Sequence, residues 1–400
     1  MKAARCCSST LLIVLAAAIL PFTGSKAWAA TEYFPIPTAS TTKNDGNDAG
    51  LIVPFLITSP EGELRYIVTP MMINNSIVGA RGTINVFRYD TGGREMRFIA
   101  SISEKIERKV MFSYIDPALV NGRYAFSVGA SFFKNATSRF FGIGPDTVEA
   151  DQTNYTAREG RAYWKFGVYL NEVTQIAIGQ RFREVEIQRG ATDLPFTTEV
   201  FPTVPGVGGA TILGNRVTFH YDTRDNLVTP TDGTEMTAYA ELNQNFQNTD
   251  QPVYYRYAVD LKKLFPSESK RMILVVRGNM QLTFGHQVPY YEQSSLGGQN
   301  NLRGYGVDRF IDDNLVGLNI EQRIHVLRAR VYNVRADFEV APFVDMGKVF
   351  SSFNAFELND LKITPGIGFR GIIRPNVVGR VDYGYSDEGG AVFAGLDFPF

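Results

Sequence analysis

The residues of this sequence best suited to chemistry are charged side chains in segments where apolar and polar residues alternate. They are Glu321, Arg323, Arg370, Arg380 and Asp382. A sixth charge, Arg303, lies in a glycine-rich stretch that reads LGGQNNLRGYGVDRF over residues 296–310. Charges of both signs pair when they share a polar interior, and arginine binds a carboxylate through two parallel hydrogen bonds. We therefore expect a ladder of ion pairs, which any polar interior requires, rather than a specific role for each charge.

The motifs of catalysis and metal binding are missing. The sequence has no Gly-x-Ser-x-Gly elbow, no Walker loop and no His-Glu-x-x-His. Its histidines, His220, His286 and His325, lack the spacing of metal ligands, so we expect no metal and no cofactor. The formal net charge of −1 predicts no nucleic-acid partner. We predict that the chain is not an enzyme, although separated barrel strands can still assemble an esterase or protease site.

The first 29 residues predict a secretory signal peptide. Lys2 and Arg5 precede an apolar run over 11–20, and Ala27-Trp28-Ala29 is a small-x-small cleavage site. The run is too short to cross a bilayer, which needs roughly 20 residues, so a membrane anchor is the weaker alternative. The only cysteines are Cys6 and Cys7, so the mature chain would have no disulfide or thiolate metal site.

Alternating apolar and polar residues predict an all-β fold, a transmembrane antiparallel β-barrel over 61–400. Near the C-terminus, Val381 and Tyr383 alternate with Arg380 and Asp382. The apolar set would face lipid, because a charge on that side near mid-bilayer costs roughly 2–4 kcal/mol. A content of 44% hydrophobic and 12% aromatic residues is typical of such barrels. The sequence has no run of 18 or more apolar residues, so it predicts no transmembrane helix.

About sixteen strands are expected, an even number as in single-chain bacterial barrels. They are 65–73, 77–89, 94–103, 107–115, 122–134, 158–171, 173–186, 211–222, 233–244, 252–265, 270–284, 313–328, 336–350, 361–373, 376–386 and 391–400. The longest connections, 135–157, 187–210 and 285–312, fall on one side, as extracellular loops do. We expect residues 30–60 to form a periplasmic N-terminal segment that is flexible over 30–50, where prolines and glycines punctuate the chain. Within it, residues 51–58 could instead extend the first strand or form a short one.

The chain ends with phenylalanines on one face of the expected last strand. Gly395, Phe398 and Phe400 form a Gly-x-x-Phe-x-Phe ending, with Pro399 as an interruption because proline cannot donate to a ladder. This ending resembles the C-terminal signal by which outer-membrane barrels are recognised for assembly. It implies that the barrel assembly machinery is a partner during biogenesis.

The segment Leu302-Arg303-Gly304-Tyr305 resembles the core of the sixth extracellular loop of the BamA/TamA superfamily, also called bacterial surface antigens. In that family the core is a hydrophobic residue, Arg, Gly and an aromatic. Three further segments match in order: 221–226 (YDTRDN), 343–347 (FVDMG) and 366–370 (GIGFR). The resemblance covers roughly 60–400 and is strongest from 211 onward. It implies a barrel in the bacterial outer membrane, surrounded by outer-membrane lipids.

The loop over 285–312 is long enough to enter the barrel lumen. About thirteen residues reach roughly 40 Å, and Gly297 and Gly298 permit sharp turns. The resemblance implies that Arg303 at the tip pairs with Asp345 on the lumenal face. We expect this pair to pin the loop inside and to hold the barrel in one state. The alternative is a solvated Arg303 on an extracellular loop.

Members of this family that insert or secrete proteins usually carry periplasmic POTRA domains ahead of the barrel. We expect none here, because residues 30–60 are too few for one. The resemblance implies a barrel that aids insertion or translocation of outer-membrane proteins or lipids, with a separate periplasmic partner. A pore-forming or structural barrel without insertase activity is the alternative.

Overall fold

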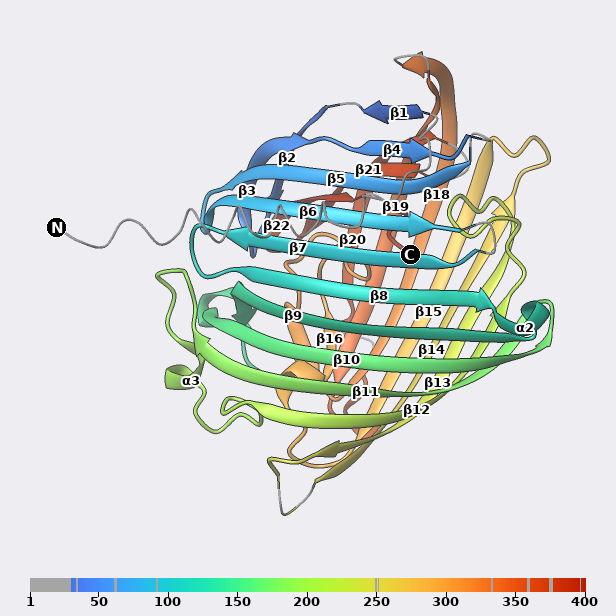
Figure 1. Ribbon diagram of the computed structural model, residues 1–400. Helices are drawn as coiled ribbons and strands as arrows, with labels where there is room; N and C mark the ends of the chain where they lie inside the picture. Colours follow the sequence, from blue (N-terminus) through green and yellow to red (C-terminus); the bar gives the residue numbers. More distant parts are fainter. Residues whose placement is uncertain are drawn as a thin grey trace.

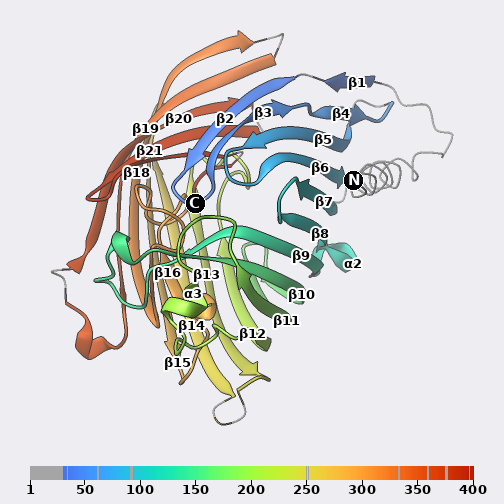
Figure 2. The same cartoon turned by 90° about the vertical axis from the view of Figure 1, so that its left-hand side faces the viewer.

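A computed structural model describes residues 30–400 except 34, 61–62, 91–92, 249, 251, 332–333, 358–359, 374–376 and 396. The predicted signal peptide, 1–29, lies outside the described residues. Twenty strands form one sheet, and two short strands form a separate ribbon. The sheet is curled, so that its earlier strands face its later ones across an interior (Figures 1 and 2). No helix in the described part of the chain is long and apolar enough to cross a membrane.

The strands and short helices follow one another with these bounds: β1 (Ala30–Tyr33), β2 (Ile36–Thr42), β3 (Gly46–Ile52), β4 (Phe55–Thr58), β5 (Leu64–Asn75), β6 (Gly79–Tyr89), β7 (Glu95–Ser103), β8 (Arg108–Ala118), α2 (Leu119–Gly122), β9 (Tyr124–Phe140), η2 (Glu149–Asp151), β10 (Thr153–Asn171), β11 (Thr174–Arg189), α3 (Thr197–Val200), β12 (Ala210–Asp222), β13 (Gly233–Asn245), β14 (Val253–Pro266), β15 (Met272–Phe284), η3 (Tyr290–Glu292), β16 (Ser294–Leu296), β17 (Phe310–Asp312), β18 (Asn314–Val331), β19 (Val334–Phe350), η4 (Phe353–Ala355), β20 (Lys362–Ile373), β21 (Val377–Ser386) and β22 (Gly389–Gly395).

From β5 onward, each strand of the sheet pairs antiparallel with the next one along the chain. β15 pairs with β18 and so bypasses the β16–β17 ribbon, which belongs to the long loop between them. Each of the sixteen predicted strands overlaps one of these strands. The predicted total of about sixteen falls short, because β1 to β4 also join the sheet.

The prediction of flexibility over 30–50 is wrong for its described residues, whereas the short strand that 51–58 could form is present as β4. β2 and β3 form a hairpin, β3 and β4 both pair with β5, and β1 pairs with β4. We call residues 30–58 the N-terminal hairpin. Pro35 and Pro54 interrupt its two arms, because proline has no amide donor for a ladder. Gly50 lets β3 approach β5, since a Cβ there would lie 2.1 Å from the Met72 carbonyl oxygen.

The two faces of the sheet differ in polarity as the alternation predicted. On β21, Tyr383 and Tyr385 are 45% and 57% exposed on the convex face. Arg380 and Asp382 on the concave face are almost completely buried. The concave face therefore holds charged groups that are shielded from solvent by other parts of the chain.

The last strand ends earlier than predicted. β22 stops at Gly395, so Phe398 and Phe400 lie outside the ladder, and Leu396 lies outside the described residues. The Phe398 ring lies 3.6 Å from the guanidinium carbon of Arg323, and the Phe400 ring lies 5.4 Å from that of Arg303. The final residues thus contact the inner charges, and cation–π attraction favours that position over continued alternation.

Candidate functional site

The long loop between β15 and β18 crosses the concave side of the sheet. We call residues 285–313 the inner loop; it contains η3, β16 and β17, of which β16 is labelled in Figure 2. Leu296, Leu302, Tyr305 and Phe310 pack with side chains of β18 and β19 in one buried cluster. Tyr290 and Ile311 pack in another with side chains of β9 and β10. The loop therefore contacts two separate arcs of the sheet.

Arg303 holds the tip of the inner loop against β19. Its Nε and Nη2 atoms donate to the two Asp345 carboxylate oxygens at 2.8 and 2.9 Å, and its backbone N–H donates to the same carboxylate at 3.0 Å. The Phe343 ring lies 3.4 Å from the guanidinium carbon, a cation–π contact. Arg303 is 1% exposed. The structure therefore brings together the two residues that the family resemblance paired, and the solvated alternative does not hold.

The five other predicted charges surround this contact. Glu321 and Asp382 accept from Arg303 Nη1 at 2.8 and 3.4 Å. Arg323 and Arg370 pair with Glu321 at 3.0 Å, and Arg370 and Arg380 pair with Asp382 at 2.8 Å. We call Arg303 and its carboxylates Asp345, Glu321 and Asp382 the arginine anchor. Four strands, β18 to β21, supply its environment.

The residues beside Arg303 complete the fit of the loop tip. Leu302 is fully buried, and the Tyr305 hydroxyl donates to Asp387 in the turn between β21 and β22. Gly304 has φ of +129°, which side chains rarely adopt, so glycine is required there. On β21, a Cβ at Gly384 would lie 2.3 Å from the Arg303 carbonyl oxygen. The close approach of loop and strand thus depends on two glycines.

A second anchor, which the sequence analysis missed, is built around Glu292 in η3. Its carboxylate accepts from Arg181 at 2.6 and 3.0 Å, from Arg183 at 2.8 Å and from Arg256 at 3.1 Å. The Tyr254 hydroxyl donates to it at 2.8 Å. We call Glu292 and these four partners the glutamate anchor. Its partners come from β11 and β14, on a different arc from the arginine anchor.

Two buried carboxylates support the arginines of the glutamate anchor. Glu241 on β13 accepts from Arg181 Nε at 2.9 Å, and Glu159 on β10 accepts from Arg183 Nε at 3.0 Å. Burial alone would raise the pKa of Glu292, but Arg181, Arg256 and Arg183 outweigh it and hold that pKa well below its usual range. Glu292 is therefore ionised at neutral pH. In the sequence, the only hint of this anchor is that Arg181 and Arg183 are two residues apart, and so lie on the same face of one strand.

The base of the inner loop carries a buried carboxyl group whose pKa is raised, whereas that of Glu292 is lowered. Asp312 on β17 is 4% exposed. Burial raises its pKa to about 6, while a hydrogen bond from the Asp313 backbone N–H acts in the opposite direction. Asp312 is thus a group of the loop whose charge changes in a mildly acidic range.

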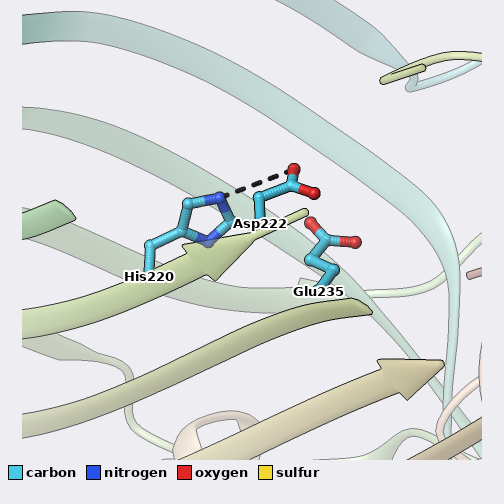
Figure 3. Close-up of side chains that lie close together, drawn as sticks. All are labelled: His220, Asp222 and Glu235. Carbon is cyan, nitrogen blue, oxygen red and sulfur yellow. Dashed lines mark ion pairs between the residues drawn. The ribbon is translucent and has the colours of Figure 1, made fainter. Parts of the chain in front are cut away.

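His220, Asp222 and Glu235 lie close together where β12 ends and β13 begins (Figure 3), and their ligand atoms lie within 4.8 Å of one another. Sequence spacing between histidines could not find this group, because two of its members are carboxylates. Arg224 donates to Asp222 at 2.7 Å and pairs with Glu235 at 3.0 Å, and Lys262 pairs with Glu235 at 2.7 Å. These cations already neutralise the carboxylates, so the arrangement favours an ion-pair network over a metal site.

Comparison with known proteins gives the class. Residues 92–373 match the Omp85 superfamily domain. The chain belongs to the Omp85 superfamily, and is an outer-membrane β-barrel of that family. No match to a curated protein was found.

Two solved structures share the fold. One is the crystal structure of BamA from Haemophilus ducreyi lacking POTRA domains 1-3, with 15% identity and a TM-score of 0.57, covering 97% of this chain and 78% of that one. The other is CdiB from Acinetobacter baumannii, with 13% identity and a TM-score of 0.51, covering 93% of this chain and 66% of that one. At these identities the likeness concerns the fold alone.

Proposed function

We propose that this barrel aids the insertion or translocation of outer-membrane proteins or lipids, together with a separate periplasmic partner. The observation that carries the proposal is the seam between the two ends of the sheet. β2 lies beside β22, but among the described residues no ladder joins them. A fully closed barrel has no strand edges, whereas here two edges face one another.

The seam is held by side chains rather than by a ladder. Lys43, in the turn of the N-terminal hairpin, donates to the Glu388 carbonyl oxygen at 2.8 Å. Asn44 exchanges two hydrogen bonds with the Val307 backbone of the inner loop, at 2.9 and 3.1 Å. A few polar contacts of about 0.5–1.5 kcal/mol each separate more easily than a full ladder. The wall can therefore open here while the two anchors keep the inner loop in place.

Locking the seam tests this function. A Lys43→Cys, Glu388→Cys variant, joined by a short bis-maleimide reagent, would be expressed in a strain depleted of the native chain. We expect the protein and lipid inventory of the outer membrane to change on depletion, and to be restored by the double-cysteine variant without reagent but not after cross-linking. Lys43→Cys alone, treated with the same reagent, is the control. An inventory unaffected by depletion would refute the proposal.

A structural or pore-forming role without insertase activity is the second candidate. The observation in its favour is that the N-terminal hairpin already occupies the place between β5 and β22. A steady open conductance in planar bilayers, with an unchanged inventory on depletion, would support it. We propose no enzymatic activity for the chain.

A further inference from the structure

The hairpin of β18 and β19 reaches beyond its neighbours at the end of β18 opposite the one that joins the inner loop (Figures 1 and 2). β15 pairs with β18 only as far as Met272 opposite Ile324, and one more backbone bond joins His325 to Arg271 at 2.8 Å. β18 then continues to Val331 and pairs with β19 alone. β18 has 18 residues, more than the about 9–11 that a membrane-spanning strand needs, so its continuation extends past the span. With the long loops taken as extracellular, this continuation lies on the periplasmic side.

The main chain of this continuation forms a free strand edge. Over residues 326–330, no described strand lies on the side of β18 opposite β19. Val326 and Leu327 are 53% and 47% exposed. After a register shift between His325 and Leu327, β19 pairs with β18 from Leu327 onward and holds it extended, so the unpaired amide and carbonyl groups of this edge are arranged as a template for another strand.

The surroundings of the free edge are basic. Arg271, Arg328 and Arg330 are exposed beside it, while Lys270 in the adjoining turn pairs with Asp225 at 3.9 Å, and Glu268 is the exposed acidic residue of that turn. Arg328 also pairs with Asp337 across the hairpin at 3.1 Å. Two copies of the chain paired edge to edge would bring like charges together, which destabilises a strand pair. The charge pattern therefore favours an acidic occupant over a second copy.

We propose that this edge binds an extended, acidic segment of a separate periplasmic protein, which adds to the sheet as a strand beside residues 326–330. The proposal rests on the proposed function in one respect, since that function calls for a periplasmic partner. The added strand would take its main-chain hydrogen bonds from β18 and place carboxylates opposite Arg328 and Arg330. This would tether the partner at the periplasmic mouth without covering the interior.

Hydrogen exchange on the full chain in nanodiscs tests the proposal. The probe is a ten-residue peptide that alternates threonine with glutamate; one control peptide has lysine for glutamate, and another has proline at alternate positions. We expect the glutamate peptide to protect the amides of 326–330 saturably and the two controls to protect them much less. Arg330→Glu should weaken binding of the glutamate peptide about fivefold and improve binding of the lysine peptide.

Three results would overturn the proposal: no protection by the glutamate peptide, equal protection by the proline peptide, or the same protection from phosphatidylglycerol in the nanodisc without peptide. The last result would assign the basic residues to lipid headgroups. Failure here, with an inventory that still changes on depletion, leaves the proposed function standing. If the peptide binds but the outer-membrane inventory is unchanged on depletion, the strand-edge proposal is supported and the proposed function is refuted.

Discussion

The two anchors of the inner loop are opposite in charge and lie on different arcs of the sheet. At the arginine anchor, one loop cation lies among carboxylates of β18, β19 and β21. At the glutamate anchor, one loop anion lies among arginines of β11 and β14. The inner loop thus ties two arcs together and contributes no net charge through its anchoring residues. The carboxylates of one arc accept only a loop cation, and the arginines of the other arc accept only a loop anion. The loop can therefore fit in only one orientation between the two arcs.

The anchors also differ in which partners the neighbouring charges would keep if the loop residue, Arg303 or Glu292, were removed. Without Arg303, Asp345 would retain Asn319 as a neutral donor at 2.9 Å but would lose its bidentate cation. Without Glu292, Arg181 and Arg183 would still pair with Glu241 and Glu159. The arginine anchor should therefore be the more sensitive of the two, although both are buried.

The largest effect is expected from Arg303→Met. It leaves the buried carboxylate of Asp345 without a cation, so the free energy of unfolding should fall by about 3–5 kcal/mol. Denaturant titration of the refolded barrel in detergent measures this. Arg158→Met is the matched control, because its pair with Glu186 is exposed, with half of each side chain accessible. That control should lose little stability, because solvent screens an exposed ion pair. Equal losses in the two variants would remove the arginine anchor from the account.

A smaller effect is expected from Glu292→Gln. The amide keeps the shape of the side chain but removes the charge, so the free energy of unfolding should fall by about 2–3 kcal/mol. Glu186→Gln serves as the exposed control and should be nearly neutral. A loss larger than that of Arg303→Met would reverse the ranking of the two anchors.

Gly384→Ala sharpens the comparison, because it should affect the arginine anchor alone. The added Cβ would lie 2.3 Å from the Arg303 carbonyl oxygen, so the loop tip must shift, at a cost of about 1–3 kcal/mol. Gly278→Ala on β15 is the control, since a Cβ there meets nothing within 4 Å. Proteolysis of the loop should become faster near its tip and stay unchanged near Glu292. An unchanged tip would show that the close approach does not hold the loop.

The smallest effect concerns pH and the base of the loop. Because the pKa of Asp312 is raised to about 6, the folded loop binds a proton more tightly than the released loop does. The protonated Asp312 carboxyl group therefore stabilises the folded loop fully below pH 4, and this stabilisation is lost as the pH rises through about 6. Loop proteolysis in the wild type should therefore accelerate between pH 4 and 7, after correction for protease activity. Asp312→Asn should flatten this dependence, and an identical profile in the variant would contradict the assignment.

How far the sequence predicted the site depended on how local each signal was. Arg303 and Asp345 were paired because a short glycine-rich motif resembles a known family. Glu292 was missed because its partners lie on strands far away in sequence, and no short motif joins Glu292 to Arg181.

The fold shows the same limit. Period-two alternation located the strands from β5 onward, since each strand carries its own pattern. The strands over 30–50 were missed because Pro35, Pro37, Gly46 and Gly50 suggest a loop, while these strands gain stability through pairing that leads to β5. The alternation of Phe398 and Phe400 suggested a strand, yet their rings lie against Arg323 and Arg303 instead.

Single-channel conductance of the double variant Glu292→Gln, Arg303→Met in planar bilayers tests the two-anchor account most directly. With both anchors lost, the inner loop should leave the interior, and conductance should become larger and more variable than in the wild type. The doubly substituted control Arg158→Met, Glu186→Gln should behave like the wild type. Indistinguishable conductance in all three proteins would contradict the claim that these buried charges hold the loop inside.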